Sequence, residues 1–221
     1  MTDNGFMALI EFVILYINEI ALIIFISCFF VYFLLLWRRV NQHAATDIRV
    51  FKLIYKNWVK SLISSEDHLI GIHALRNFIR GNSTFVSALF ILLGLLVGFY
   101  QTTFDITGKF FAIQGISVPL MKLTLTIMVT IFCLMNFILA IRFSSRLSLL
   151  LAGNPSQFSL GEIEGQKITG ETLEKAHNHW MLGVRGLFFL LGTLFWYINA
   201  GVFIVGNIII FAYLLSALDY I

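Results

Sequence analysis

The stretch Ile20–Trp37, IALIIFISCFFVYFLLLW, runs for eighteen residues without a charged side chain. The hydrocarbon core of a bilayer is about 30 Å thick, so a helix needs roughly 20 mainly apolar residues to cross it. Thr84–Tyr100 and Leu123–Ile141 are similarly apolar. Hydrophobic residues make up 59% of the chain and charged residues 12%, and the mean hydropathy is +0.89. The sequence therefore predicts an all-α, polytopic helical membrane protein.

A fourth apolar stretch, Met181–Ser216, is too long for one crossing, because as a single helix it would measure about 54 Å. Trp196, Tyr197, Asn199 and Gly201 near its middle are typical of an interfacial aromatic belt followed by a turn. We therefore expect two short spans that form a hairpin, and a helix pair that re-enters only partway is the alternative. The count is four to five membrane segments, with five preferred, in a single membrane domain over residues 1–221. The expected spans are about 18–37, 83–100, 120–142, 181–198 and 202–218.

Basic residues are concentrated in two segments of the chain. Of the fifteen Lys and Arg residues, eight fall within Arg38–Arg80 and five within Arg142–Arg185. Because cytoplasmic loops collect Lys and Arg, segments 38–80 and 143–180 are expected in the cytoplasm and the amino terminus outside. We expect a multi-pass protein of the cell (inner or plasma) membrane. A start without Lys or Arg also argues against a cleaved signal peptide.

The segment Thr46–Ser64 predicts an amphipathic helix in the cytoplasm. Its apolar face carries Phe51, Ile54, Tyr55, Trp58 and Leu62, and its basic stripe carries Arg49, Lys52, Lys56 and Lys60. Such a helix can lie in the membrane plane with its basic stripe on anionic lipid. It can equally pack against the cytoplasmic end of the bundle, and the two interpretations are compatible.

Three further local features bear on the helices. Ser64 and Asp67 resemble a capping box, so a new helix is expected to begin there and run into the second span. Gly161–Gly170 reads as a polar connector, after which a helix restarts at Thr172. In the second span the pairs Ser83/Ser87 and Gly94/Gly98 are four residues apart, a spacing that favours close helix packing within or between subunits.

Four motifs follow one another along the chain. Trp58-Val59-Lys60 lies in the amphipathic segment, Leu75-Arg76-Asn77 opens the second span, and Ala140-Ile141-Arg142 closes the third. Gly183-Val184-Arg185 precedes Phe188-Phe189 and Trp196. With these motifs, roughly residues 20–215 resemble the prokaryotic and plant membrane proteins of the domain of unknown function 599 family. The resemblance implies a small polytopic helical membrane protein and no particular activity. The chain departs from the family pattern at Arg80, where a smaller or apolar residue is expected.

Polar residues near the membrane form three candidate sites. On the cytoplasmic side, a basic cluster suited to a ligand or to anionic lipid comprises Arg76, Arg80, Arg142, Arg146, Arg185 and His73. The alternative is that these arginines only reflect the positive-inside bias. Within the spans, Thr126, Thr130, Asn136 and Asn207 could line a pore, or could join helices by hydrogen bonds, which is the favoured interpretation. On the outer side, Glu11 and Glu19 would form acidic rings in an oligomer.

These features favour a homo-oligomeric, channel-like or transporter-like protein for ions or small solutes. The alternative is a non-conducting membrane scaffold or lipid-binding interaction protein. Membrane lipids, anionic at the cytoplasmic face, are the expected partners. We expect no catalytic residues, metal, cofactor or nucleic-acid partner, because the chain contains no recognisable nucleophile motif, phosphate loop or zinc spacing.

Overall fold

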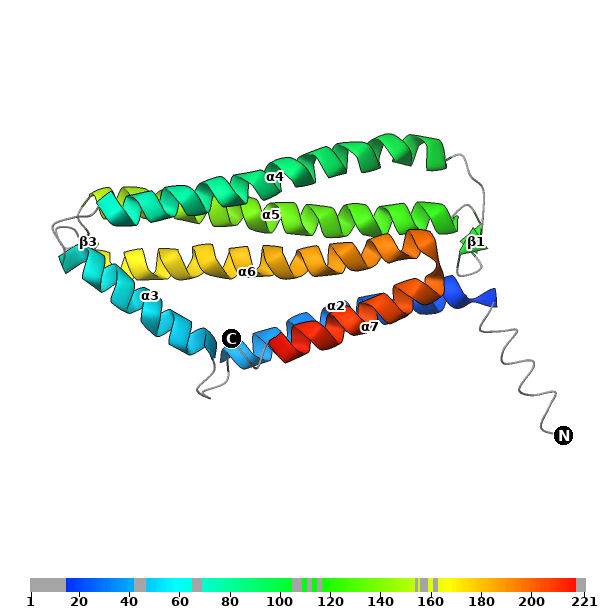
Figure 1. Cartoon of the computed structure of the whole chain (residues 1–221), viewed down its shortest axis with the longest axis horizontal. Coiled ribbons are helices and arrows are strands. Elements are labelled where there is room, and N and C mark those ends of the chain that lie inside the picture. The colour runs from blue at the N-terminus through cyan, green and yellow to red at the C-terminus, as the bar shows by residue number, and fades with distance from the viewer. Residues whose placement is uncertain are drawn as a thin grey trace. The chain divides into compact units, whose positions relative to one another are not determined.

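Six long helices make up the computed structural model, which describes residues 15–41, 47–64, 69–104, 109–110, 113–114, 117–153, 155, 159–160 and 163–217. Figure 1 shows their order along the chain. The helices are α2 (Ile17–Asn41), α3 (Asp47–Ser64), α4 (Leu69–Phe104), α5 (Val118–Ala152), α6 (Gly165–Ile198) and α7 (Ala200–Ala217). The all-α prediction is confirmed.

Two short hairpins connect helices. Strand β1 (Lys109–Phe110) pairs antiparallel with β2 (Ile113–Gln114) between α4 and α5. Strand β3 (Ser159–Leu160) pairs antiparallel with β4 (Ile163–Glu164) between α5 and α6. The second hairpin corrects one expectation, because α6 begins at Gly165 and not at Thr172. Residues 165–170, which are most of the expected polar connector, therefore form the first turn and a half of α6.

Four helices are long and apolar enough to cross a membrane, within the part of the chain that the structure describes: α2, α4, α5 and α6. The shorter apolar helix α7 follows them. Helix α6 ends at Ile198 and α7 begins at Ala200, so the long apolar stretch divides at Asn199, as its turn residues predict. The chain is a multi-pass integral membrane protein.

The helices contribute to two compact units. Unit 1 draws on Met1–Gln42, Leu95–Val129 and Phe188–Ile221, and unit 2 on His43–Gly94 and Thr130–Leu187. In unit 1, α2 lies beside α7 (Figure 1). The core between them is aromatic: the Phe25 ring stacks on Phe203 at 5.6 Å and meets Phe189 edge-on at 6.0 Å. Unit 1 is thus held by large apolar side chains.

Unit 2 packs α5 closely on α6 through two glycines. A Cβ at Gly186 would lie 2.7 Å from Sγ of Cys133, and one at Gly183 would lie 3.1 Å from the Phe137 ring. Small residues let membrane helices approach closely. In contrast, a Cβ at Gly94 or Gly98 would meet nothing within 4 Å. The predicted packing role of these two glycines is therefore wrong within the described chain.

Candidate functional site

Within unit 2, helix α3 packs through the apolar face that the sequence predicts. Leu62 joins a buried cluster with Leu75, Leu147 and Leu151. Gly71 at the start of α4 permits this approach, because a Cβ there would lie 2.6 Å from Cδ1 of Leu62. The amphipathic helix therefore packs against the other helices of unit 2.

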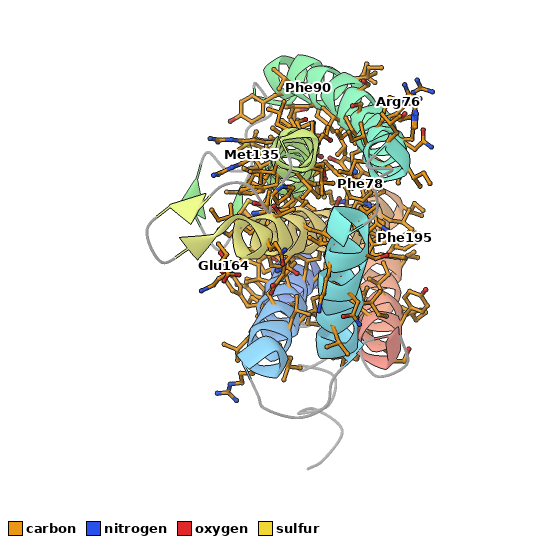
Figure 2. The ribbon with its side chains drawn as sticks, turned by 90° about the vertical axis from the view of Figure 1, so that its left-hand side faces the viewer. Arg76, Phe78, Phe90, Met135, Glu164 and Phe195 are labelled. Carbon is orange, nitrogen blue, oxygen red and sulfur yellow. The ribbon has the colours of Figure 1, made fainter. Side chains whose placement is uncertain are left out.

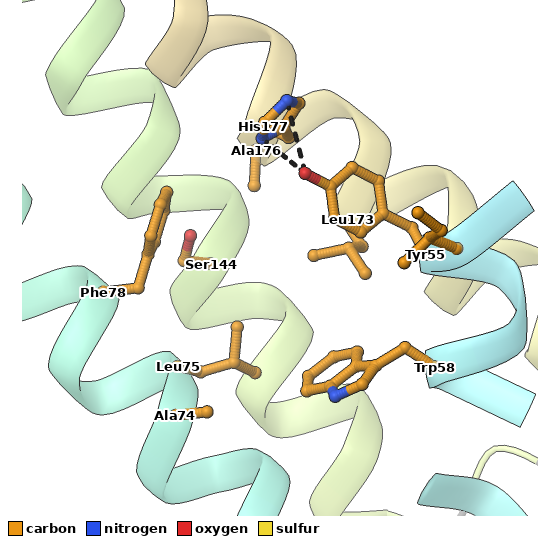
Figure 3. Close-up of a pocket in the computed structure, with 10 residues that line it drawn as sticks. Tyr55, Trp58, Ala74, Leu75, Phe78, Ser144, Leu173, Ala176 and His177 are labelled. Carbon is orange, nitrogen blue, oxygen red and sulfur yellow. Dashed lines mark hydrogen bonds between the residues drawn. The ribbon is translucent and has the colours of Figure 1, made fainter. Parts of the chain in front are cut away.

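An apolar pocket of about 290 Å³ lies where α3 meets α4, α5 and α6 (Figure 3). Its lining residues are Ile54, Tyr55, Trp58, Ala74, Leu75, Phe78, Ser144, Leu173, Ala176 and His177. Pockets that hold small molecules range from about 300 to 1,000 Å³ and are mostly apolar with a few placed polar groups. This pocket lies at the small end of that range and has the expected composition.

One hydrogen-bonded pair supplies most of the polarity of the pocket. The Tyr55 hydroxyl lies 2.9 Å from Nδ1 and 3.3 Å from Nε2 of His177 (Figure 3). The hydroxyl of Ser144 donates instead to the carbonyl of Ala140, at 2.8 Å. The Tyr55–His177 pair is therefore the polar end of an otherwise apolar cavity.

The surroundings of this pair favour its neutral form. Burial, with the positive charge of Arg185 as the second cause, lowers the pKa of His177 below its ordinary value of 6.5. Burial also raises the pKa of Tyr55. Near neutral pH the phenol is thus protonated and the imidazole uncharged, so Tyr55 can donate to a ring nitrogen of His177.

The residues of the predicted basic cluster lie on α4, α5 and α6. Arg76, Arg80 and His73 on α4 and Arg142 and Arg146 on α5 are exposed, and none of them lines the pocket. In Figure 2 Arg76 lies at the outer edge of α4, while Phe78 of the same helix lies on the inner side. Arg185 differs, because it is half-buried and its charge acts on His177.

The predicted polar stripe is buried among the helices. Thr126 donates to the carbonyl of Lys122 at 2.9 Å, and Asn207 donates to that of Phe203 at 2.7 Å. Asn136 donates to the carbonyl of Phe132 at 2.9 Å, and its Oδ1 lies 3.1 Å from Nδ1 of His179. These three side chains and Thr130 are at most 8% exposed. This burial fits helix packing better than a water-filled path within one chain.

Of the two acidic candidates, the structure describes only Glu19. Glu19 is buried, at 9% exposed, which does not fit an open acidic ring. Glu11 lies outside the described residues. Next to Glu19, Asn18 accepts a hydrogen bond from Nε1 of the fully buried Trp196, at 3.1 Å. The sequence does not reveal this link.

The two neighbouring histidines of α6 point to different partners, as their spacing predicts. His177 meets Tyr55, whereas His179 meets Asn136 and stacks on the ring of Phe143 at 5.5 Å. Among the described residues, no group of three or more His, Cys, Asp and Glu side chains could hold a metal ion.

Most of the chain matches a known protein family. The family model described as "Protein of unknown function, DUF599" matches residues 20–220. The chain belongs to the DUF599 family. The match confirms the resemblance seen in the Trp58, Arg76, Arg142 and Arg185 motifs. The chain matches no curated protein and no solved structure.

Proposed function

We propose that this DUF599 protein is a non-conducting lipid-binding membrane protein, in which the pocket beneath α3 holds an acyl chain. The observation that carries the proposal is the apolar pocket itself, bounded by α3, α4, α5 and α6. Hydrocarbon chains are the abundant apolar molecules around an integral membrane protein. An acyl chain in this pocket would contact Trp58, Leu75 and Leu173, and van der Waals packing would hold it there, because the surrounding lipid is itself apolar.

The position of α3 supports this proposal. Val59 and Leu62 are buried, whereas Leu53 and Ile54 are 61% and 50% exposed. An interfacial helix needs such an exposed apolar surface to enter the headgroup region. We propose that α3 lies at the inner, cytoplasmic leaflet of the cell membrane, where lipid has direct access to the pocket.

Filling the pocket tests the proposal. Ala74 lines the pocket and is itself exposed, so Ala74→Phe adds a ring at the opening without burying it in the core. The matched control is Asn77→Phe, at an exposed position of the same helix that does not line the pocket. Native mass spectrometry of the full-length protein should show lipid adducts that Ala74→Phe removes and Asn77→Phe retains. Equal adducts in all three proteins would contradict the proposal.

A second proposal is a homo-oligomeric, channel-like or transporter-like protein. Only 11% of the apolar window of α4 is buried within the chain, and the surroundings of Gly94 and Gly98 are open. This face of α4 would suit a second copy of the chain, and the exposed Arg76 and Arg80 would then lie beside the interface. Flux assays in liposomes test the proposal, and protein that moves no ion or small solute would contradict it.

A further inference from the structure

We propose that the lipid held beneath α3 is an anionic phospholipid, with one acyl chain in the pocket and its phosphate at the Tyr55–His177 pair. This inference rests on the proposed lipid-binding function. It adds the headgroup class and the two side chains that recognise it.

The first argument is the polarity of the pocket. Apolar side chains surround most of the cavity, and among the described residues the polar side-chain groups in its lining belong to Tyr55, Trp58, Ser144 and His177. Ser144 is fully buried and donates to a backbone carbonyl. An amphiphile fits such a cavity in one orientation, with its chain among the apolar residues and its polar group at Tyr55 and His177.

The second argument is the chemistry of these two side chains. A phenol hydroxyl donates one hydrogen bond, and a neutral imidazole donates one from whichever nitrogen carries the proton. Phosphate oxygens accept such bonds strongly, because one partner is charged. The O–H of Tyr55 can turn about its C–O bond, away from the His177 ring and towards a phosphate oxygen. Both acceptors would lie at the same end of the pocket.

The third argument is charge complementarity. The segments that surround the pocket are α3, residues 69–80 of α4, residues 142–152 of α5 and residues 165–187 of α6. They carry eleven Lys and Arg residues and three acidic residues, Asp47, Glu171 and Glu174. Arg185 acts electrostatically on His177 itself. A headgroup with a net negative charge is therefore favoured over a zwitterionic one, because the surrounding charge is mostly positive.

A competition experiment tests the headgroup. Full-length protein is equilibrated with vesicles of equal parts dioleoyl-phosphatidylglycerol and dioleoyl-phosphatidylcholine, whose acyl chains are identical, and bound lipid is counted by native mass spectrometry. We expect about a tenfold preference for phosphatidylglycerol, because its headgroup has a net negative charge, whereas choline cancels the charge of the same phosphate in phosphatidylcholine. Tyr55→Phe keeps the ring and should lower the amount of both bound lipids severalfold, because both present a phosphate to the Tyr55 hydroxyl. Tyr213→Phe, at an exposed tyrosine of α7, is the matched control and should keep the bound amounts.

The outcomes separate this inference from the function on which it rests. Equal binding of the two lipids, or unchanged amounts of bound lipid in Tyr55→Phe, would overturn the headgroup assignment and leave acyl-chain binding intact. Competition by oleate as strong as that by phosphatidylglycerol would overturn it too, because a carboxylate would then replace the phosphate. If Ala74→Phe removes no lipid adduct, the lipid-binding function itself is overturned.

Discussion

The hydroxyl of Tyr55 lies 2.9 Å from Nδ1 of His177, although the two residues are 122 positions apart in the sequence. This bond joins α3 to α6 at the edge of the pocket lining (Figure 3). We expect Tyr55→Phe to destabilise the protein by about 1 kcal/mol, because a part-buried imidazole loses its partner. Thermal unfolding in detergent measures the loss. Tyr213→Phe should leave the unfolding temperature unchanged, and an equal loss in both variants would contradict the assignment.

Stability should also depend on pH through His177. Its pKa in the folded protein is lowered from 6.5 by burial and then by Arg185, so the unfolded chain takes up a proton more readily than the folded one. Stability is therefore retained above about pH 6.5 and is lost as the pH falls from 6.5 through the folded pKa. His177→Gln should flatten this acid-side decline in the unfolding temperature. His179, whose pKa is also lowered by burial, supplies a remaining slope. An identical decline in wild type and His177→Gln would contradict the prediction.

Gly186 on α6 should tolerate a larger side chain far less well than Gly94 on α4. A Cβ at Gly186 would lie 2.7 Å from Sγ of Cys133 and 3.2 Å from the Phe132 ring, whereas one at Gly94 would meet nothing within 4 Å. Gly186→Val should cost about 1–3 kcal/mol through overpacking. Gly94→Val is the control and should be close to neutral in unfolding assays. A smaller loss at Gly186 than at Gly94 would contradict the packing of α5 on α6.

The link between Asn18 and Trp196 should stabilise unit 1. Asn18 is the acceptor for Nε1 of a fully buried indole. Its replacement by leucine should cost roughly 0.6 to 1.7 kcal/mol, the range found for hydrogen bonds between membrane helices. Chemical unfolding in mild detergent tests this, with Ile23→Leu, at an exposed position of α2, as the control. No difference between the two variants would show that the bond contributes nothing.

The homo-oligomer proposal predicts a specific effect at the open face of α4. Gly94→Leu and Gly98→Leu should change the oligomeric state measured by light scattering in detergent. They should not lower the stability of the chain itself, because a Cβ at either position would meet nothing within 4 Å among the described residues. A strictly monomeric wild-type protein would contradict the proposal.

Hydropathy was sufficient to predict the helices, because lipid requires long apolar segments whose backbone is hydrogen-bonded internally. The division of the last apolar stretch at Asn199 followed from local turn and belt residues. The sequence predicts too late a beginning for α6, because the polar residues at 165–170 are typical of a connector although they extend an apolar helix. Propensity alone does not separate a polar loop from the polar end of a long helix.

The candidate site was only partly predictable. The apolar face of α3 identified Tyr55 and Trp58, but the sequence does not show that His177 meets Tyr55, since that contact depends on tertiary packing. Gly94 and Gly98 matched a packing motif, yet the close contacts are made at Gly183 and Gly186. Spacing shows which residues share a helix face, and it does not show which face meets a neighbour.

The central claim is that an acyl chain occupies the pocket beside Trp58, and fluorescence quenching tests it most directly. Protein is reconstituted in phosphatidylglycerol whose acyl chains carry bromine, and the Trp58 signal is taken as the difference between wild type and Trp58→Phe. The account predicts that bromine quenches this signal, that Ala74→Phe relieves the quenching and that Asn77→Phe does not. Equal quenching with and without the phenylalanine at position 74 would contradict the account.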